Sequence, residues 1–275
     1  MNKLSPIGVF DSGYGGLTIL KEIKNLLPQY DFIYLGDNAR TPYGTRSFKT
    51  VYDYTKECVK WLFERNCSLV ILACNTASAK ALRTIQQKDL PEINSKKRVL
   101  GVIRPTAEVI GNFSTSNQIG ILGTNGTIQS GSYLLEIEKS FPGIKIFQQA
   151  CPLWVPLIEN NEYESEGADF FIKKDIQMLL EKSPEIDTIL LACTHYPLVL
   201  NKIKNHLPGN IKVISQGAIV AKSLQDYLKR HPEMERRCSK NGQLAFFTTD
   251  SAVDFDKHSE IFFGGKVSSV HIDLV

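Results

Sequence analysis

Short apolar runs alternate with amphipathic segments along almost the whole chain. The apolar runs have the length of buried strands, and they cover residues 7–10, 32–35, 69–72, 99–102, 118–122, 145–148, 188–191 and 212–214. Between them, apolar residues recur at helical spacing in the segments 17–27, 50–65, 170–182 and 219–228. This alternation predicts the α/β fold class, with parallel sheets and helices packed on both faces of each sheet.

Two phrases recur in the same order in the two halves of the chain. An apolar run followed by small polar residues, at 7–13, has a counterpart at 119–125, an offset of 112 residues. A second run ends in Ala-Cys at 69–74 and again at 188–193, an offset of 119 residues. The similar offsets predict two related halves, each of them an α/β unit.

The part of the chain after the second Ala-Cys run holds two more strand-like pieces, at 244–248 and 267–272. We expect this segment to pack back on the first half, so that the two domains are not consecutive in the sequence. The predicted division is a first domain of residues 1–98 with 212–275 and a second domain of residues 99–211. The cleft between such domains would hold both Ala-Cys cysteines.

The composition is that of an ordinary globular protein. With 275 residues, of which 43% are hydrophobic and 22% charged, the chain can form one large domain or two of medium size. The net charge of +3 favours neither a nucleic acid nor a membrane surface as a partner. No apolar run approaches the roughly 18 residues of a membrane span, and residues 1–6 carry no secretory signal. We therefore expect a cytoplasmic protein.

The cysteines do not form the pattern of a disulfide framework or of a zinc site. None of the six belongs to a Cys-x-x-Cys pair or to a set of His and Cys residues at ligand spacing. We therefore expect reduced thiols and no metal. Four cysteines lack a polar setting at the end of a strand, and we interpret these as structural: Cys58, Cys67, Cys151 and Cys238.

The other two cysteines, Cys74 and Cys193, each end an apolar run and precede polar residues. A parallel strand ends at the carboxyl edge of its sheet, where open α/β sheets bind ligands. A free thiol has a pKa of about 8.5, and a helix N-terminus with donor groups nearby would lower the pKa of both thiols. The alternative, that both are small core hydrophobes, leaves the matched phrases unexplained.

Two loops that follow strands carry polar groups suited to an anionic ligand. Asp11 and Ser12 precede a glycine-rich turn at 13–16, whose glycines permit close backbone approach and whose helix N–H groups favour an anion. The spacing is not that of the dinucleotide-binding fingerprint. In the second loop, Tyr43 and Gly44 can offer a hydroxyl and a backbone N–H to a carboxylate, and the alternative is a capped surface loop.

Three ionisable side chains stand where they can assist the thiols. His195 comes two residues after Cys193 and can exchange a proton with it or cap the following helix. Asp11 can play the same part for Cys74. Glu159 ends an apolar stretch and can orient an imidazole, although the residues alone favour an exposed helix acid.

Four ordered motifs make the chain resemble the glutamate racemases of the cofactor-independent aspartate/glutamate racemase family. The motifs span residues 10–17, 36–44, 73–77 and 192–198. The resemblance implies two α/β domains related by a pseudo-two-fold axis, with the active site in the cleft between them. It also implies an isomerase that converts L-glutamate to D-glutamate for bacterial peptidoglycan synthesis, without a cofactor or a metal, and it allows a homodimer.

The resemblance further implies which residues form the site. The two catalytic thiols fall on Cys74 and Cys193, and their assisting groups fall on Asp11 and His195. The acid that orients the imidazole falls on Glu159. The positions that fall on substrate contacts are Asp11, Ser12, Tyr43, Gly44, Asn75, Thr76, Thr124, Thr127, Thr194 and His195.

Racemisation explains why two thiols are present. A single base tends to return the proton to the face it came from, whereas two opposed groups invert the centre if each serves as acid or base. By resemblance, Cys74 acts on D-glutamate and Cys193 on L-glutamate. Three alternatives stay open: an aspartate racemase on the same scaffold, an amino-acid-binding protein without turnover, and a hydrolase that uses Cys193 with His195 and leaves Cys74 unexplained.

Overall fold

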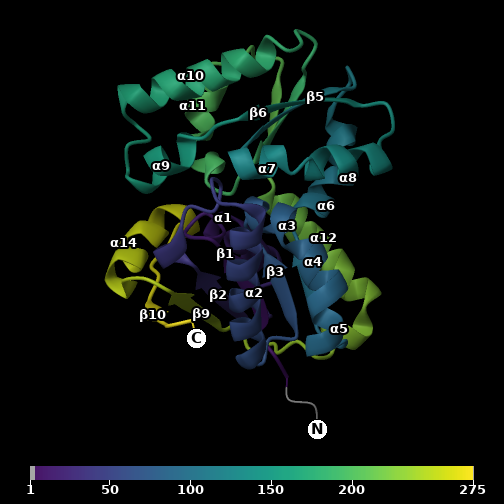
Figure 1. Ribbon diagram of the computed structural model, residues 1–275, viewed down its shortest axis with the longest axis vertical. Helices are drawn as coiled ribbons and strands as arrows, with labels where there is room; N and C mark the ends of the chain where they lie inside the picture. Colours follow the sequence, from purple (N-terminus) through teal and green to yellow (C-terminus); the bar gives the residue numbers. More distant parts are fainter. Residues whose placement is uncertain (1–3, 275) are drawn as a thin grey trace.

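The computed structural model describes residues 4–274 and contains two separate parallel sheets surrounded by helices (Figure 1). In spatial order, the first sheet consists of β10 (Ser269–His271), β9 (Leu244–Thr248), β2 (Phe32–Gly36), β1 (Ile7–Asp11), β3 (Leu69–Leu72) and β4 (Arg98–Gly101). The second sheet consists of β6 (Lys145–Ala150), β5 (Gln118–Gly123), β7 (Thr188–Ala192) and β8 (Lys212–Ile214). All neighbouring strands within each sheet pair in parallel, as predicted.

The second sheet repeats the topology of part of the first. Its order β6-β5-β7-β8 matches β2-β1-β3-β4 strand for strand, with the same succession along the chain. The strands β1, β3 and β7 are buried along their whole length, which explains their continuous apolar runs. The repeat that the sequence predicts is therefore present in the topology of the two halves.

The strand register brings particular side chains to the edges of the sheets. Strands β1 and β3 end side by side, so Ser12 and Cys74 follow at the same edge of the first sheet. Strands β5 and β7 also end side by side, so Thr124 and Cys193 follow at the same edge of the second sheet. In both sheets this is the carboxyl edge, at which open α/β sheets bind ligands.

The four predicted helices are present with shifted ends, as α1 (Leu17–Leu26), α2 (Phe48–Glu64), α10 (Glu166–Leu180) and α12 (Gly217–Arg230). Ser47 and Ser165 cap α2 and α10 by accepting a backbone N–H in the first turn. Most other helices are short: α3 (Asn75–Lys80), α4 (Leu82–Thr84), α5 (Leu90–Ile93), α6 (Ile103–Ala107), α7 (Asn125–Gln129), α9 (Trp154–Glu159), α11 (Leu200–Asn205) and α13 (Pro232–Glu235).

Two longer helices, α8 (Ser132–Ser140) and α14 (Ala252–Phe263), are not predicted by the apolar pattern. Each buries only a few side chains, and large apolar residues such as Leu134, Leu135 and Val253 are exposed on them. The apolar stripe that identifies an amphipathic helix is therefore blurred in the sequence.

The chain passes from one sheet to the other after β4 and returns after β8. The predicted domain boundaries, after residues 98 and 211, are each too early, because β4 still pairs with β3 and β8 still pairs with β7. Strand pairing moves the two crossings to positions after residues 101 and 214. A polar turn before an edge strand resembles a linker in sequence, which explains the difference.

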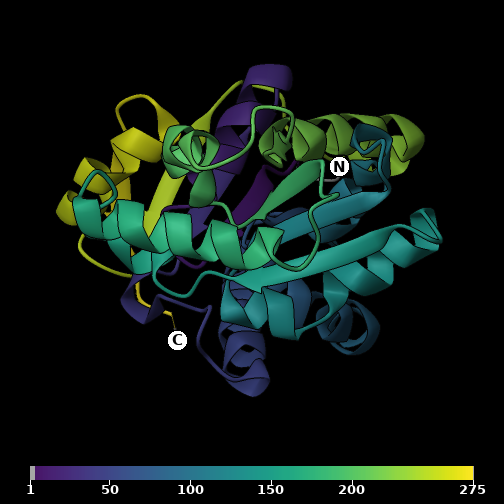
Figure 2. The ribbon, with the colours of Figure 1, turned by 90° about the horizontal axis from the view of Figure 1, so that it is seen from above.

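The C-terminal segment packs on the first half, as predicted. Strand β9 pairs with β2 and β10 pairs with β9, so both extend the first sheet. Helix α14 packs against α1, and Figures 1 and 2 show this segment in yellow beside the first sheet. Residues 1–3 and residue 275 lie outside the described part. The expectation that residues 1–6 carry no secretory signal therefore falls partly on residues that the structure does not describe.

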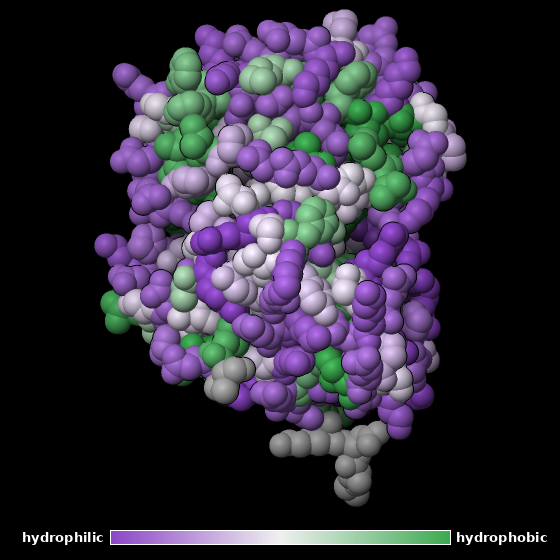
Figure 3. Space-filling view, in the orientation of Figure 1, coloured by the Kyte–Doolittle hydropathy of each residue, from purple (hydrophilic) through white to green (hydrophobic). Residues whose placement is uncertain are grey.

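The described helices include none that is long and apolar enough to cross a membrane. The face drawn in Figure 3 is mostly hydrophilic, and its apolar residues form several separate groups. Scattered exposed apolar residues of this kind are usual on a protein surface.

Candidate active site

The two strand-end thiols occupy similar places in the two halves. Cys74 follows β3 and caps α3, where its Sγ accepts the backbone N–H of Ala77 at 3.4 Å. Its Sγ also lies 3.4 Å from the Ser12 hydroxyl. Cys193 follows β7, and its Sγ lies 3.9 Å from Nδ1 of His195. Both cysteines are buried.

Both thiols line a single pocket, to which the two halves of the chain contribute. The pocket contains about 580 Å³ of empty space including its open mouth, a volume in the range of small-molecule sites. Its walls are formed by Ser12, Thr41, Pro42, Tyr43, Gly44, Thr45, Cys74, Asn75, Thr76, Thr124, Asn125, Cys151, Pro152, Val155, Pro156, Cys193, Thr194 and His195. The expectation that one cleft holds both cysteines therefore agrees with the geometry.

Burial controls the ionisation of Cys74. It raises the pKa of this thiol to about 12, and the nearby Asp11 carboxylate raises it further, while bonds from Ser12 and Ala77 oppose the rise. The sequence predicts a lowered pKa from the helix N-terminus, and this prediction is wrong for Cys74 because desolvation outweighs the helix. The surroundings of Cys74 therefore favour its protonated form at neutral pH.

Cys193 has a different partner, a histidine that is itself held by a carboxylate. His195 is buried, and its Nε2 lies 2.8 Å from Oε1 of Glu159 on α9. Burial lowers the pKa of His195, but its bonds with Cys193 and Glu159 outweigh burial and raise the pKa well above the ordinary value. As an imidazolium, His195 can donate to both partners at once, to the Cys193 sulfur through Nδ1 and to Glu159 through Nε2.

The two thiols therefore have different neighbours. Cys74 lies near a hydroxyl, a backbone N–H and the buried Asp11 carboxyl, whereas Cys193 lies near a histidine whose pKa is raised. The ring of Phe262 on α14 packs edge-on against the His195 ring, with 5.4 Å between centroids. The C-terminal helix thus helps to fix the histidine, a contact that the sequence does not predict.

Asp11 lies behind the pocket and is not part of its wall. Its side chain is fully buried, Oδ2 accepts the N–H of Gly13 at 3.0 Å, and Oδ1 has no hydrogen-bond partner within residues 4–274. Burial raises the pKa of Asp11, and the positive charge on His195 opposes this rise. Asp11 is therefore placed to affect the ionisation of Cys74 and not to hold a ligand directly.

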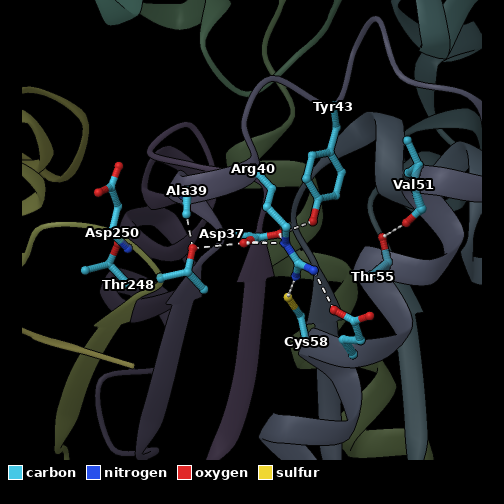
Figure 4. Close-up of polar contacts among 11 residues, drawn as sticks. Asp37, Ala39, Arg40, Tyr43, Val51, Thr55, Cys58, Thr248 and Asp250 are labelled. Carbon is cyan, nitrogen blue, oxygen red and sulfur yellow. Dashed lines mark hydrogen bonds and ion pairs between the residues drawn. The ribbon is translucent and has the colours of Figure 1, made fainter. Parts of the chain in front are cut away.

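The loop that carries Tyr43 and Gly44 is anchored by Asp37 (Figure 4). The buried Asp37 carboxylate accepts from Nε of Arg40 at 2.7 Å, from the Thr249 hydroxyl at 2.9 Å and from the Tyr43 hydroxyl. The Tyr43 hydroxyl therefore points into the first half and not toward a ligand, unlike the sequence interpretation. Tyr43 and Gly44 both line the pocket, and Gly44 can present only backbone to it.

Threonines close the pocket where the two halves meet. The hydroxyls of Thr76 and Thr124 lie 2.9 Å apart, and the Thr127 hydroxyl lies 3.1 Å from that of Thr124. Thr127 is fully buried behind Thr124 and is not part of the pocket wall. The carbonyl of Thr194 accepts from Thr18 at 3.0 Å, which adds a second contact between the halves.

The Asn75 side chain is also directed away from the pocket. Its Nδ2 donates to Gln216 and its Oδ1 accepts from Tyr133, two residues that the sequence interpretation does not include. For Gln216 a signal exists, because it follows β8 at a carboxyl edge, as the cysteines follow β3 and β7. Cys151, interpreted as structural, lines the pocket, and burial raises its pKa.

A comparison with known proteins identifies the group to which this site belongs. The family model described as Asp/Glu/Hydantoin racemase matches residues 7–224. The chain belongs to this family. It is therefore a racemase enzyme, and the predicted α/β fold with two parallel-sheet halves is confirmed.

Proteins named as glutamate racemases, some of them with solved structures, align with nearly the whole length of this racemase. Glutamate racemases from Geobacter metallireducens and Aquifex aeolicus are 39% and 37% identical to it, over 96% and 95% of this chain and 95% of each relative. A glutamate racemase structure from Bacillus anthracis has a TM-score of 0.88 at 34% identity, with 98% of both chains covered. One from Francisella tularensis, in complex with D-glutamate, has a TM-score of 0.86 at 32% identity, again with 98% of both chains covered.

The state of Asp11 predicts an unusual effect of pH on the stability of this racemase. A carboxyl with a raised folded-state pKa contributes stability that is present below its unfolded pKa and lost as pH rises through the folded one. The substitution Asp11→Asn should therefore stabilise the protein relative to wild type more at pH 7.5 than at pH 4.5. Each unit of raised pKa corresponds to about 1.4 kcal/mol.

Denaturant unfolding at the two pH values measures this difference. Asp187 is the matched control, because its carboxylate accepts four bonds from Ser114, Thr115 and Ser116, which outweigh partial burial and lower its pKa. Asp187→Asn should lose stability by nearly the same amount at both pH values, because the contribution of a carboxyl with a lowered pKa is lost only below its unfolded pKa of about 3.9. If Asp11→Asn also lost stability at pH 7.5, this result would contradict the conclusion that burial raises the pKa of Asp11.

Proposed function

We propose that this racemase interconverts L- and D-glutamate by a two-base mechanism in which Cys74 and Cys193 act on opposite faces of the α-carbon. The observation that carries this proposal is the placement of two thiols at matching strand ends of a repeated topology, around one pocket. Glutamate as the substrate is supported by the names of the relatives and by the Francisella tularensis complex with D-glutamate.

Hydroxyl and amide groups of the pocket would bind the two carboxylates of the substrate. Ser12, Thr76 and Thr124 bring hydroxyls to the wall, and the loop from Thr41 to Thr45 brings backbone groups. These donors come from both halves, so a bound ligand would hold the halves together. Water is then excluded from the α-carbon, which strengthens every polar contact inside the site.

In the direction from L- to D-glutamate, the Cys193 thiolate takes the α-proton from one face. His195 holds the proton that the Cys193 thiol has given up, and Glu159 keeps the imidazolium in place. The Cys74 thiol then donates its proton to the opposite face of the carbon. The products are D-glutamate, a protonated Cys193 and a Cys74 thiolate, and proton exchange with solvent restores the starting state.

In the direction from D- to L-glutamate, Cys74 must first lose its proton. Asp11 is suited to receive it, because its own pKa is raised by burial and it lies in the electrostatic neighbourhood of Cys74. An acid and a base whose pKa values approach each other exchange a proton at little cost. The assignment of Cys74 to D-glutamate and Cys193 to L-glutamate follows the family resemblance.

The carbanion between the two proton transfers needs stabilisation, since an α-proton is a very weak acid. Preorganised donors around the α-carboxylate can stabilise the charge as it develops. Ser12 and Thr76 follow the first-half strands, and Thr194 follows a second-half strand, so donors reach the carboxylate from two directions. The proposed steps use side chains of this chain alone, without a cofactor or a metal.

We expect both single substitutions Cys74→Ser and Cys193→Ser to reduce racemisation by about 10²–10⁴-fold, the usual contribution of a general acid or base. The measurement follows optical rotation and α-deuterium incorporation in heavy water, with each glutamate enantiomer and with both aspartate enantiomers. Cys238→Ser, which replaces a buried thiol outside the pocket, should retain activity. Full activity in either pocket variant would remove that thiol from the mechanism.

The same experiment separates the alternatives. An aspartate racemase would turn over aspartate in preference to glutamate. A binding protein without turnover would introduce no deuterium at the α-carbon of either amino acid. A hydrolase that uses Cys193 and His195 would form a covalent adduct that mass spectrometry detects after a rapid quench.

Glu159 should act through His195, which predicts a shift in pH dependence. Because the bond with Glu159 contributes to the raised pKa of His195, Glu159→Gln should lower that pKa. The imidazolium would then be lost at a lower pH, so the kcat/KM profile for L-glutamate should fall at lower pH than in wild type. Glu162→Gln, on the exposed turn after α9, is the control and should leave the profile unchanged. An unshifted profile in Glu159→Gln would contradict this role.

We propose that the D-glutamate serves peptidoglycan synthesis in the cytoplasm of a bacterium. A homodimer, which the resemblance allows, is compatible with this role. Expression of the chain in a bacterium that requires external D-glutamate should remove this requirement and restore normal cell shape. The Cys74→Ser variant expressed at the same level should fail. Growth with the Cys74→Ser variant, or no growth with the wild-type chain, would contradict the proposal.

A further inference from the structure

Both connections between the two halves of the chain meet in one buried polar cluster beside Cys74. The exit connection runs from β4 into α6 through Val102, and the return connection runs from β8 into α12 through Gln216. Asn75, the first residue of α3, lies between them and directly follows Cys74. Tyr133 on α8 completes the cluster from the second half.

Three side chains of this cluster form a closed ring of hydrogen bonds. Asn75 Nδ2 donates to Gln216 Oε1 at 2.7 Å, Gln216 Nε2 donates to the Tyr133 oxygen at 2.6 Å, and the Tyr133 hydroxyl donates to Asn75 Oδ1 at 2.6 Å. Each residue donates once and accepts once, so the orientation of both amides is fixed by the ring. All three side chains are buried, and burial raises the pKa of Tyr133, which keeps its hydroxyl a donor.

The ring is tied to the exit connection as well. Gln216 Nε2 lies 3.0 Å from the Thr106 hydroxyl and 3.4 Å from the Val102 carbonyl. The Thr106 hydroxyl itself donates to the Val102 carbonyl at 3.0 Å. Ser78 on α3 accepts the Val102 N–H at 3.3 Å. Helix α3 is thus bonded to the return connection through Asn75 and to the exit connection through Ser78.

A rotation of α3 would displace Cys74, because this residue caps the helix. Its Sγ accepts the Ala77 N–H, so the thiol direction depends on the first turn of α3. The ring holds that turn through Asn75, its first residue. A closed ring of directional hydrogen bonds specifies one arrangement, whereas an apolar contact at the same place would allow several.

We propose that the Asn75–Tyr133–Gln216 ring positions the Cys74 thiol relative to Cys193, so that Tyr133 and Gln216 are positioning residues for the D-glutamate face. This inference rests on the two-thiol function proposed above. Through Asn75 and α3, the ring couples the relative placement of the two halves to the direction of the Cys74 thiol. Within residues 4–274 the ring makes no hydrogen bond with Cys193, which has its own support from His195 and Glu159.

The test uses Tyr133→Phe and Gln216→Met, which remove hydrogen bonds and nearly keep the side-chain volumes. Tyr30→Phe is the matched control, because Tyr30 is also buried and its hydroxyl donates to Glu235 at 3.0 Å, away from the pocket. The kcat for racemisation should fall about 10- to 100-fold in the ring variants, as a misplaced catalytic group predicts. The KM for glutamate should change much less, since neither Tyr133 nor Gln216 is part of the pocket wall.

Hydrogen exchange in heavy water distinguishes positioning from general destabilisation. From L-glutamate, Cys193 still removes the α-proton, but a misdirected Cys74 fails to protonate the other face. The measured quantity is the ratio of deuterated L-glutamate recovered to D-glutamate formed. In the ring variants this ratio should be about 10-fold higher than in wild type. From D-glutamate, exchange and conversion should fall together, because Cys74 must act first.

Three results would overturn the inference. The first is a ring variant whose kinetics match Tyr30→Phe, and the second is an equal loss of exchange and conversion from both enantiomers. The third is a wild-type enzyme that racemises while Cys74→Ser does so equally well. A wild-type protein that exchanges no α-proton would instead overturn the proposed function itself, so the two failures are distinguishable. If Tyr133→Phe does not fold, Gln216→Met and Thr106→Val give the same comparison.

Discussion

Burial of two thiols at the carboxyl edges of two parallel sheets is the constraint on which the site depends. A parallel strand that is covered on both faces can present a side chain to a ligand only where it ends. Cys74 and Cys193 stand at such ends and are both buried, and removal from water opposes the thiolate form of Cys74. The neighbours of each thiol decide how far the effect of burial on its ionisation is offset.

The compensation differs between the two thiols. Cys193 lies beside a buried imidazole that Glu159 holds in place. Cys74 has a hydroxyl, one backbone N–H and a nearby buried carboxyl, and it remains a thiol. This asymmetry suits a reaction in which one group removes a proton while the other supplies one. The duplicated topology provides the two positions, and different neighbours make them complementary.

Much of the fold follows from the sequence because buried parallel strands require continuous apolar runs. For the same reason, the ends of β3 and β7, and with them both thiols, are predictable. The orientation of the Tyr43 hydroxyl is not, because it depends on Asp37 and Thr249, which lie far apart in the sequence. The raised pKa of Cys74 depends on burial that no local pattern encodes. Helix α14 and its Phe262 contact escape prediction because the helix buries so few residues.

The most direct measurement is a structure of the wild-type chain with glutamate bound. The account predicts the sulfur atoms of Cys74 and Cys193 on opposite faces of the α-carbon, each at about 3–3.5 Å from it, the distance of reacting atoms in a near-attack geometry. A glutamate molecule approached by both sulfurs from one face, or bound with one of them out of reach, would contradict inversion by these two residues.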